Sequence, residues 1–259
     1  MDDICRDLEL EHDELDALVE PLDEAQWSEP TPAAGWAIRD QVSHLWFFDV
    51  RALMALTDPE AFERDKRELL AGGGTDASVE PGRTMAGVEL LRLWRTDRAR
   101  LLEAARGVDP AARVPWYGPS MAARSFITAR LMETWAHGQD VVDALGSVRQ
   151  STARLRHVAH IGVRARPFSY VVNGMAMPEQ DVCVRLDAPD GTQWVWGESS
   201  TDTVFGSALD FCLVVTQRRH LADTGLEVEG PAAREWISIA QAFAGPPGGG
   251  RAAGMFPQP

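Results

Sequence analysis

Residues 133–145 have the sequence ETWAHGQDVVDAL, and this stretch decides the first half of the fold. It belongs to a pattern of apolar residues at helical spacing that runs from about Met121 to Leu145, and Gly146 follows where a helix C-cap glycine belongs. Glu133 and His137 are four residues apart. A helix therefore places them one turn apart on one face, where both can reach a single ion.

Three further helices are predicted upstream of this segment. Asp3 to Val19 is amphipathic, Ile38 to Leu56 carries a broad apolar stripe, and Met85 to Ala105 repeats the helical period. The stretches WSEPTPAAGW (27–36), AGGGTDASVEPG (71–82) and RGVDPAARVPWYGPS (106–120) carry proline, glycine and polar residues, which predicts loops, the second of them flexible. Four helices joined by substantial loops predict an N-terminal, all-α antiparallel four-helix bundle over residues 1–147.

After Gly146 the sequence predicts a mixture of helix and strand. The stretch VCVRLDAPDGTQWVWG (182–197) predicts a β-hairpin that turns at Asp190-Gly191. LEVEG (226–230) predicts a short strand. Helices are expected over Ser151–Ala165, Thr203–Thr216 and Pro231–Phe243. This mixture predicts a smaller α+β domain over residues 148–245, followed by a flexible tail at 246–259, within GPPGGGRAAGMFPQP.

The composition is that of a globular protein with an acidic surface. The chain has 259 residues, of which 45% are hydrophobic and 25% charged, and its formal net charge is −14. Because an acidic surface repels phosphate backbones and anionic lipids, nucleic acid and membranes are poor partners. The sequence shows no apolar run long enough for a membrane span, and the acidic start MDDICRDLELEHDELD does not resemble a secretory signal. We therefore expect a cytoplasmic location, with Cys5, Cys183 and Cys212 as reduced thiols.

His44 is the third candidate metal ligand. It lies in the apolar helical run QVSHLWFFDV (41–50), and the helix that carries Glu133 and His137 is also predicted to be buried. Burying a carboxylate with imidazoles is costly unless a cation pairs them, and two histidines with one carboxylate form a catalytic zinc set that leaves a position open. Spacing alone leaves two alternatives: a hydrogen-bonded core histidine at position 44, and an ordinary i,i+4 contact between Glu133 and His137.

The other histidines are weaker candidates. His157 and His160 have arginines rather than carboxylates beside them, and His12 lies among acidic residues on a helix, which predicts a solvated side chain. His220 follows two arginines and suits an anion better than a metal. No GxSxG, P-loop or GxGxxG motif occurs in the sequence.

The segments GWAIRDQVSHL (35–45) and ETWAHGQDVVDAL (133–145) resemble the DinB-like, mycothiol-dependent maleylpyruvate isomerase family. RLDAPDGTQWVWG and GSALDFCLVVTQRRHLADT resemble an uncharacterised actinobacterial subgroup of metal-binding proteins within it. The resemblance implies a DinB-like bundle followed by a sterol-carrier-like α+β domain. It also implies that His44, Glu133 and His137 hold the metal.

The resemblance further implies an isomerase or transferase that acts on a small molecule with mycothiol, whose thiol the metal activates. The ligand set suits Zn²⁺, with Fe²⁺ or Ni²⁺ as alternatives. In the family, an arginine of the second domain is thought to meet the substrate carboxylates. Arg218 and Arg219 are the candidates by chemistry, because a guanidinium matches a carboxylate bidentately; the alternative is a solvated basic helix end.

Residues around the metal have predicted supporting roles. Asp40 and Asp140 are candidates to orient a ligand imidazole, and for Asp140 a surface acid is the alternative. Trp36, Trp46 and Trp116 are candidates for the pocket wall. Two other functions stay open: a metal-binding protein without catalysis that holds an apolar ligand in its sterol-carrier-like domain, and a metal-dependent hydrolase.

Overall fold

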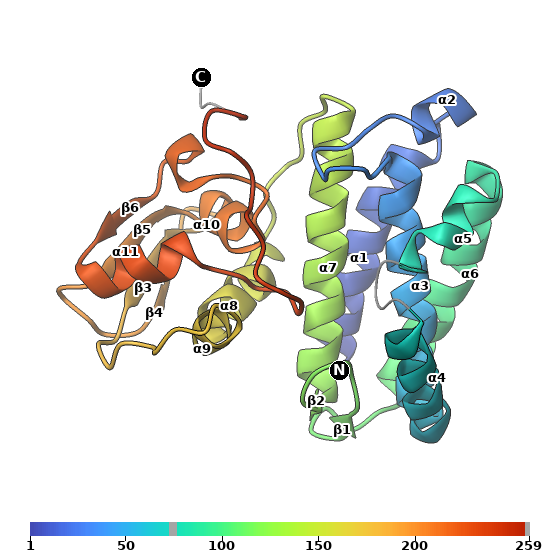
Figure 1. Cartoon of the computed structure of the whole chain (residues 1–259), viewed down its shortest axis with the longest axis horizontal. Coiled ribbons are helices and arrows are strands. Elements are labelled where there is room, and N and C mark those ends of the chain that lie inside the picture. Colours follow the sequence, from blue (N-terminus) through green and yellow to red (C-terminus); the bar gives the residue numbers. More distant parts are fainter. Residues whose placement is uncertain (73–76, 257–259) are drawn as a thin grey trace. The chain divides into compact units, whose positions relative to one another are not determined.

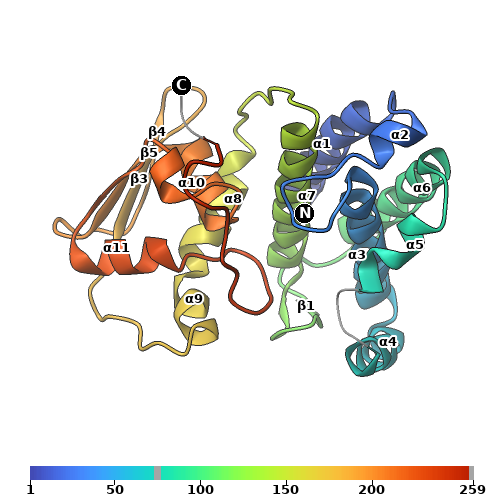
Figure 2. The ribbon, with the colours of Figure 1, turned by 45° about the horizontal axis from the view of Figure 1, so that its top comes forward.

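The computed structural model of the chain describes residues 1–72 and 77–256. It divides into two compact units, Met1–Arg149 and a second that begins at Gln150. The first is helical, and the smaller second unit contains a mixed sheet with helices packed on it (Figure 1, Figure 2). A helical N-terminal region followed by a smaller α+β region is therefore confirmed.

The first unit is built from long helices at the positions that the sequence predicts. They are α1 (Asp2–Val19), α3 (Ile38–Thr57), α6 (Gly87–Arg106) and α7 (Ala123–Ala144). α1 and α3 each pack against both α6 and α7. The shorter elements are α2 (Glu24–Trp27), α4 (Pro59–Ala71), α5 (Glu80–Arg83), β1 (Arg113–Val114) and β2 (Met121–Ala122). The observed ends of the long helices lie within two residues of the predicted ones.

The sequence predicted none of these shorter elements. Helix α4 was not predicted, although Asp58 accepts a hydrogen bond from the Ala61 N–H at 2.9 Å and Pro59 stands in its first turn. The predicted flexible loop 71–82 is partly wrong, because its last residues form α5, while residues 73–76 lie outside the described part. The predicted loop 106–120 contains β1, which pairs antiparallel with β2.

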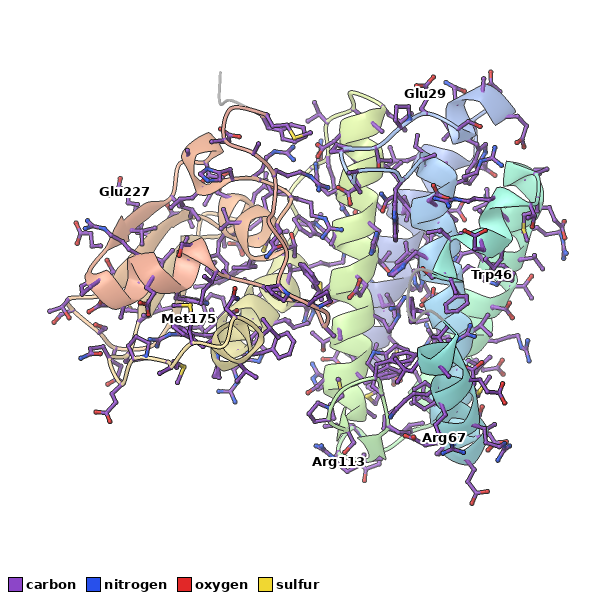
Figure 3. All side chains as sticks on the ribbon, viewed as in Figure 1. Glu29, Trp46, Arg67, Arg113, Met175 and Glu227 are labelled. Carbon is purple, nitrogen blue, oxygen red and sulfur yellow. The ribbon has the colours of Figure 1, made fainter. Side chains whose placement is uncertain are left out.

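The core of the first unit lies among its long helices. It comprises Leu15, Val19, Trp27, Ile38, Val42, Leu45, Leu90, Leu91, Trp94 and Val141. Trp27 packs directly on Gly87, where an added Cβ would lie 2.4 Å from the indole, so the contact requires glycine. Trp46, labelled in Figure 3, packs against this core and donates its Nε1–H to Asp97 Oδ2 of α6 at 2.9 Å.

The end of α7 has the predicted glycine cap. Gly146 adopts φ +59°, and the Ser147 N–H donates to the Val142 carbonyl at 3.0 Å, which confirms the predicted role of this glycine. Arg149 then folds back on the first unit, where its Nη1 donates to the Trp135 carbonyl at 3.0 Å and its guanidinium pairs with Glu11. The chain therefore belongs to the first unit up to this arginine.

The sheet of the second unit contains the predicted hairpin. Its strands are β3 (Cys183–Asp187), β4 (Gln193–Trp196), β5 (Thr203–Ser207) and β6 (Glu227–Glu229), in the order β4-β3-β5-β6. β3 pairs antiparallel with β4 and parallel with β5, and β5 pairs antiparallel with β6. The hairpin between β3 and β4 and the short strand β6 confirm two predictions.

Three helices of the second unit are shorter than predicted, and a fourth, Arg166–Val172, was not predicted. They are α8 (Leu155–Arg164), α9 (Arg166–Val172), α10 (Ala208–Val215) and α11 (Pro231–Ser238), with a 3₁₀ turn at Leu221–Asp223. The prediction of a helix over Thr203–Thr216 was wrong for the first third of that range. Those residues form β5 between β3 and β6, and the helix starts only after its N-cap residue Ser207. The predicted helix from Pro231 ends before Phe243, because the Ala242 N–H donates to the Val215 carbonyl.

The C-terminal segment contacts the second unit through Asp223. Asp223 Oδ1 accepts from the Gly254 N–H at 2.7 Å, and Asp223 Oδ2 accepts from the Phe256 N–H at 3.3 Å. The predicted domain bounds 1–147 and 148–245 and the flexible tail 246–259 stay predictions, and residues 257–259 lie outside the described part. None of the helices in the described residues combines the length and apolar character needed to cross a membrane.

Candidate metal centre

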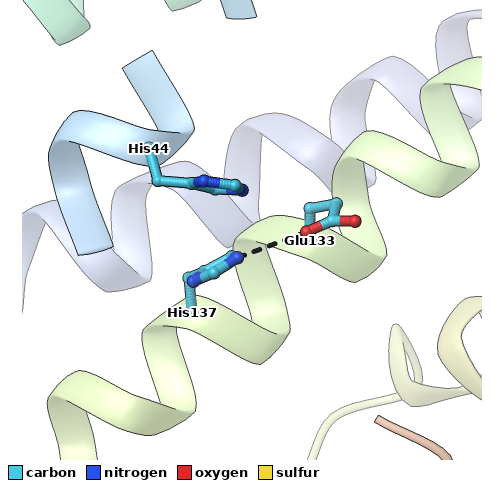
Figure 4. Close-up of side chains that lie close together, drawn as sticks. All are labelled: His44, Glu133 and His137. Atoms are coloured by element: carbon cyan, nitrogen blue, oxygen red, sulfur yellow. Dashed lines mark ion pairs between the residues drawn. The ribbon is translucent and has the colours of Figure 1, made fainter. Parts of the chain in front are cut away.

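Three side chains from two helices converge in the first unit, as Figure 4 shows. His44 comes from α3, while Glu133 and His137 come from successive turns of α7. Each offers a ligand atom within 4.8 Å of the other two. The two imidazole centroids are 4.4 Å apart, and His137 Nε2 lies 3.3 Å from Glu133 Oε2. No other such group of His, Cys, Asp and Glu occurs within residues 1–72 and 77–256.

A buried ion pair joins the two helices close to these ligands. Asp49 of α3 accepts a hydrogen bond from Arg130 Nε of α7 at 3.0 Å and another from Trp94 Nε1 of α6 at 2.9 Å. The Asp49 side chain is 0% exposed and that of Arg130 4%. Because Asp49 follows His44 and Arg130 precedes Glu133 by about one turn, the pair sets the helix separation at which the ligands meet.

Each imidazole has a polar partner at its Nδ1. His137 Nδ1 lies 2.6 Å from Gln41 Oε1, and His44 Nδ1 lies 2.9 Å from Ser78 Oγ. Both partner residues are 0% exposed. With Nδ1 engaged in this way, each ring keeps Nε2 for an ion. Neither partner was predicted, although a glutamine in a buried helical run three residues before His44 is a signal for Gln41.

Ser78 reaches His44 because its segment lies very close to α3. Ser43 Oγ donates to the Ser78 carbonyl at 2.8 Å and accepts from the Gly82 N–H at 3.0 Å. A Cβ on Gly82 would lie 2.5 Å from Ser43 Cβ, so this approach requires glycine.

Glu133 is held in its ionised form. Burial opposes ionisation, but the hydrogen bond with His137 and the positive charges of His137, His44 and Arg130 outweigh it and lower the pKa of Glu133 to about 2. If His137 Nε2 carries no proton, its lone pair faces this carboxylate at 3.3 Å, which is repulsive. A proton or a cation between the two atoms makes the contact favourable, so the donor set fits a divalent ion.

Aromatic rings cover the two imidazoles. The indole of Trp36 stacks on His137 with centroids 5.8 Å apart and contacts His44 at 5.2 Å, and Phe48 contacts His44 at 4.7 Å. Two other tryptophans were predicted to line the pocket. The ring centroids of Trp116 and Phe48 are 6.1 Å apart, whereas the Trp46 indole donates a hydrogen bond to Asp97.

The predicted supporting residues lie in different surroundings. Asp40 accepts hydrogen bonds from Arg83 Nε at 2.9 Å and from the Ala37 N–H at 2.9 Å, while Gln41 and Ser78 are the residues that bond the imidazoles. Asp140 is fully buried on α7, three residues after His137. The roles assigned to Asp40 and Asp140 stay predictions.

Arg218 and Arg219 belong to the second unit, directly after α10. Arg218 Nη1 donates to the Thr216 carbonyl at 2.7 Å, and the Arg219 guanidinium lies 3.7 Å from the centroid of the Phe256 ring. Their assignment to a substrate carboxylate stays a prediction.

Two other groups of reactive side chains are buried. His12, predicted to be solvated, is 1% exposed, and neither ring nitrogen makes a hydrogen bond among the described residues, so that prediction was wrong. It lies edge-on to Trp94 in the core, which amphipathic spacing alone did not indicate. Cys5, Cys183 and Cys212 are buried free thiols, and burial raises the pKa of Cys212, which disfavours a nucleophilic thiolate.

A helical unit with a His–Glu–His cluster, followed by a smaller unit with a mixed sheet, defines the class: a two-unit protein with a candidate metal centre between two helices. The model of the mycothiol maleylpyruvate isomerase N-terminal domain matches residues 8–142, and the chain belongs to that family.

The chain is also similar to two mycobacterial proteins and to two solved structures. Two uncharacterized proteins of Mycobacterium tuberculosis, MT0041 of strain CDC 1551 / Oshkosh and Rv0036c of strain ATCC 25618 / H37Rv, are each 47% identical over 253 residues, covering 95% of this chain and 96% of theirs. The crystal structure of the mycothiol-dependent maleylpyruvate isomerase matches with a TM-score of 0.57 at 18% identity, covering 89% of this chain and 94% of that one. A histidine-to-alanine mutant of that enzyme matches with a TM-score of 0.58 at 17% identity, covering 84% and 89%. At these identities the two structures show a shared fold.

Proposed function

We propose that this protein is a divalent-metal-dependent enzyme that uses mycothiol, or a similar low-molecular-weight thiol, in an isomerase or transferase reaction on a small molecule. The observation that carries the proposal is the convergence of His44, Glu133 and His137 on one point. Membership of a family named for mycothiol maleylpyruvate isomerase supports the thiol. Two imidazoles and a carboxylate suit Zn²⁺ first, with Fe²⁺ or Ni²⁺ as the alternatives.

The side chains around the centre prepare it for an exogenous thiol. A bound ion would supply a Lewis acid that lowers the pKa of a coordinated thiol. Gln41 and Ser78 orient the imidazoles, and Trp36 covers both of them. The Glu133 side chain is 23% exposed against 10% for His137, so we infer that the thiol approaches from the side of the carboxylate.

The proposal extends to the finer features that the family implies. We infer that α1, α3, α6 and α7 form a DinB-like antiparallel four-helix bundle and that the second unit is sterol-carrier-like. A substrate carboxylate would meet Arg218 or Arg219, whose guanidinium groups have the matching geometry. A small molecule and a thiol are then the expected partners, in the cytoplasm.

Elemental analysis of the purified protein tests the metal. We expect about one equivalent of zinc or a similar ion, which His44→Ala should strip, because removal of one of three protein ligands weakens the site. His157→Ala, which changes a histidine of α8 instead, is the matched control and should keep the ion. Full retention of the metal by His44→Ala would refute the assignment.

Titration with mycothiol tests the thiol. Mycothiol should protect the metal from a chelator and raise the melting temperature, because a ligand that binds only the folded protein stabilises it. An isomerase leaves the thiol concentration unchanged during turnover, whereas a transferase consumes one thiol per product. If neither mycothiol nor a smaller thiol shifts chelation or melting, the protein binds metal without using a thiol.

A further inference from the structure

Gln41 links the candidate metal centre to the loop that precedes α3. It lies on α3 one turn before His44, and its side chain is 0% exposed. Its Nε2 donates to Thr31 Oγ1 at 2.8 Å, and its Oε1 lies 2.6 Å from His137 Nδ1. A buried amide with both ends engaged has a defined orientation and is costly to disturb.

The direction of this hydrogen-bond chain follows from its first member. The carbonyl of Trp36 can only accept, and Thr31 Oγ1 donates its single proton to that carbonyl at 2.9 Å. Thr31 Oγ1 must therefore accept from Gln41, which places the amide nitrogen at the threonine and the amide oxygen at His137. Because an amide oxygen only accepts, His137 Nδ1 must carry a proton.

We propose that Gln41 is a positioning residue that fixes His137 as its Nδ1–H tautomer and so presents the Nε2 lone pair to the ion. The atoms agree with this assignment, because Nε2 is the nitrogen that lies 3.3 Å from Glu133 Oε2, inside the ligand cluster. A neutral histidine with the proton on Nε2 would turn a donor towards the ion and could not bind it. The inference rests on the proposed function for the ion, while the hydrogen-bond chain stands without it.

Through the same hydrogen bonds, the orientation of His137 depends on the loop of residues 30–37, which contains Trp36. The backbone of the loop is closed by a bridge between Pro30 and Ala37, and the Thr31 N–H also donates to the Trp36 carbonyl at 2.8 Å. Trp36 then contacts His137 a second time, because its indole stacks on the imidazole with an interplanar angle of 14°. Trp36 is thus connected to His137 in two ways: its carbonyl acts through Thr31 and Gln41, and its indole stacks directly on the imidazole.

Substitutions at both links test the proposal. Gln41→Leu keeps the volume but removes the acceptor, and we expect it to weaken Zn²⁺ binding about 10–100-fold, as loss of a partner of a ligand imidazole does. Gln41→Glu keeps an acceptor for Nδ1–H and should rescue the affinity to within a few-fold of the wild-type protein. Thr31→Val removes the anchor of the amide and should give an intermediate loss. Gln139→Leu is the matched control, since this buried glutamine of α7 bonds Asp143 and neither imidazole.

The tautomer itself gives a readout that a purely structural bond would not move. Two-bond ¹H–¹⁵N correlation spectra of the metal-free full chain at pH 8 report for each ring nitrogen of His137 whether it carries a proton. We expect Nδ1–H in the wild-type protein and in Gln41→Glu, and a mixture of tautomers in Gln41→Leu. If Gln41→Leu does not fold, Thr31→Val and the wild-type spectrum carry the test.

The outcomes separate this inference from the proposed function. An Nδ1 without a proton in the wild-type protein, or unchanged Zn²⁺ affinity in folded Gln41→Leu and Thr31→Val, overturns the role of Gln41. A wild-type protein that shows the Nδ1–H tautomer and binds no divalent ion contradicts the proposed function instead.

Discussion

Replacing Asp49 with asparagine leaves the charge of Arg130 without its buried partner. Asparagine has nearly the same shape and still offers an oxygen to Trp94 Nε1, so the change isolates the charge. Both side chains of the pair are almost inaccessible to water, at 0% and 4%. Removal of one member of such a pair costs about 3–5 kcal/mol, which is a large share of the stability of a domain.

The expected loss is confined to the first unit. Urea unfolding of the metal-free full chain, followed by circular dichroism, measures the free energy of unfolding. Because the two units need not unfold together, hydrogen exchange of the α3 and α7 amides shows whether the loss of stability belongs to the first unit. Glu89→Gln is the control, since its partner Arg92 is 62% exposed and their pair should make no measurable difference. A loss of less than about 1 kcal/mol for Asp49→Asn would refute the argument that the pair is buried and unsolvated.

A second variant separates the charge from the packing. Replacing both partners, as Asp49→Leu with Arg130→Met, should recover most of the stability, because two apolar side chains leave no unpaired charge. The metal affinity should fall in Asp49→Asn as well, since the pair joins the helices that carry the ligands. An unchanged metal affinity would show that the core alone sets the separation of α3 and α7.

Two further predictions concern the core of the same unit. Burial, together with two nearby arginine charges, holds the pKa of His12 well below 6.5. Below pH 6.5 the unfolded chain therefore binds more protons than the folded protein. The free energy of unfolding should fall there by up to about 1.4 kcal/mol for each pH unit that the pH is lowered. Melting temperatures between pH 8 and pH 5 measure this slope, and His12→Gln should flatten it; an equal slope in both proteins would contradict the assignment. Gly87→Ala should destabilise the protein by about 1–3 kcal/mol, because the new Cβ would meet the Trp27 ring at 2.4 Å. Gly118→Ala, whose Cβ meets nothing within 4 Å, should have little effect by the same measurement of unfolding in urea.

Local signals in the sequence determined most of the helical unit. The helical period predicted α1, α3, α6 and α7, and in α1, α3 and α6 this period follows the face that each helix buries. The same period placed Glu133 and His137 one turn apart. Gly146 marked the end of α7, because a left-handed residue at that position strongly favours glycine.

Elements that depend on distant partners were harder to predict. Thr203–Ser207 forms β5 only because β3 and β6 lie on either side of it, and both are remote in the sequence. Its apolar residues continue into α10, so a short window could not separate the strand from the helix that follows. Helix α4, in contrast, had local signals at Asp58 and Pro59.

For the candidate metal centre, the sequence by itself determined that two ligands share a helix face and nominated His44 as the third through its apolar surroundings. Tertiary structure decided that this histidine meets them, because the Asp49–Arg130 pair and the core set the distance between α3 and α7. It also decided the imidazole partners, since Gln41 and His137 are 96 residues apart in the chain. Helical periodicity acts over one turn and is visible in the sequence, whereas a hydrogen bond between helices exists only once packing has brought its two ends together.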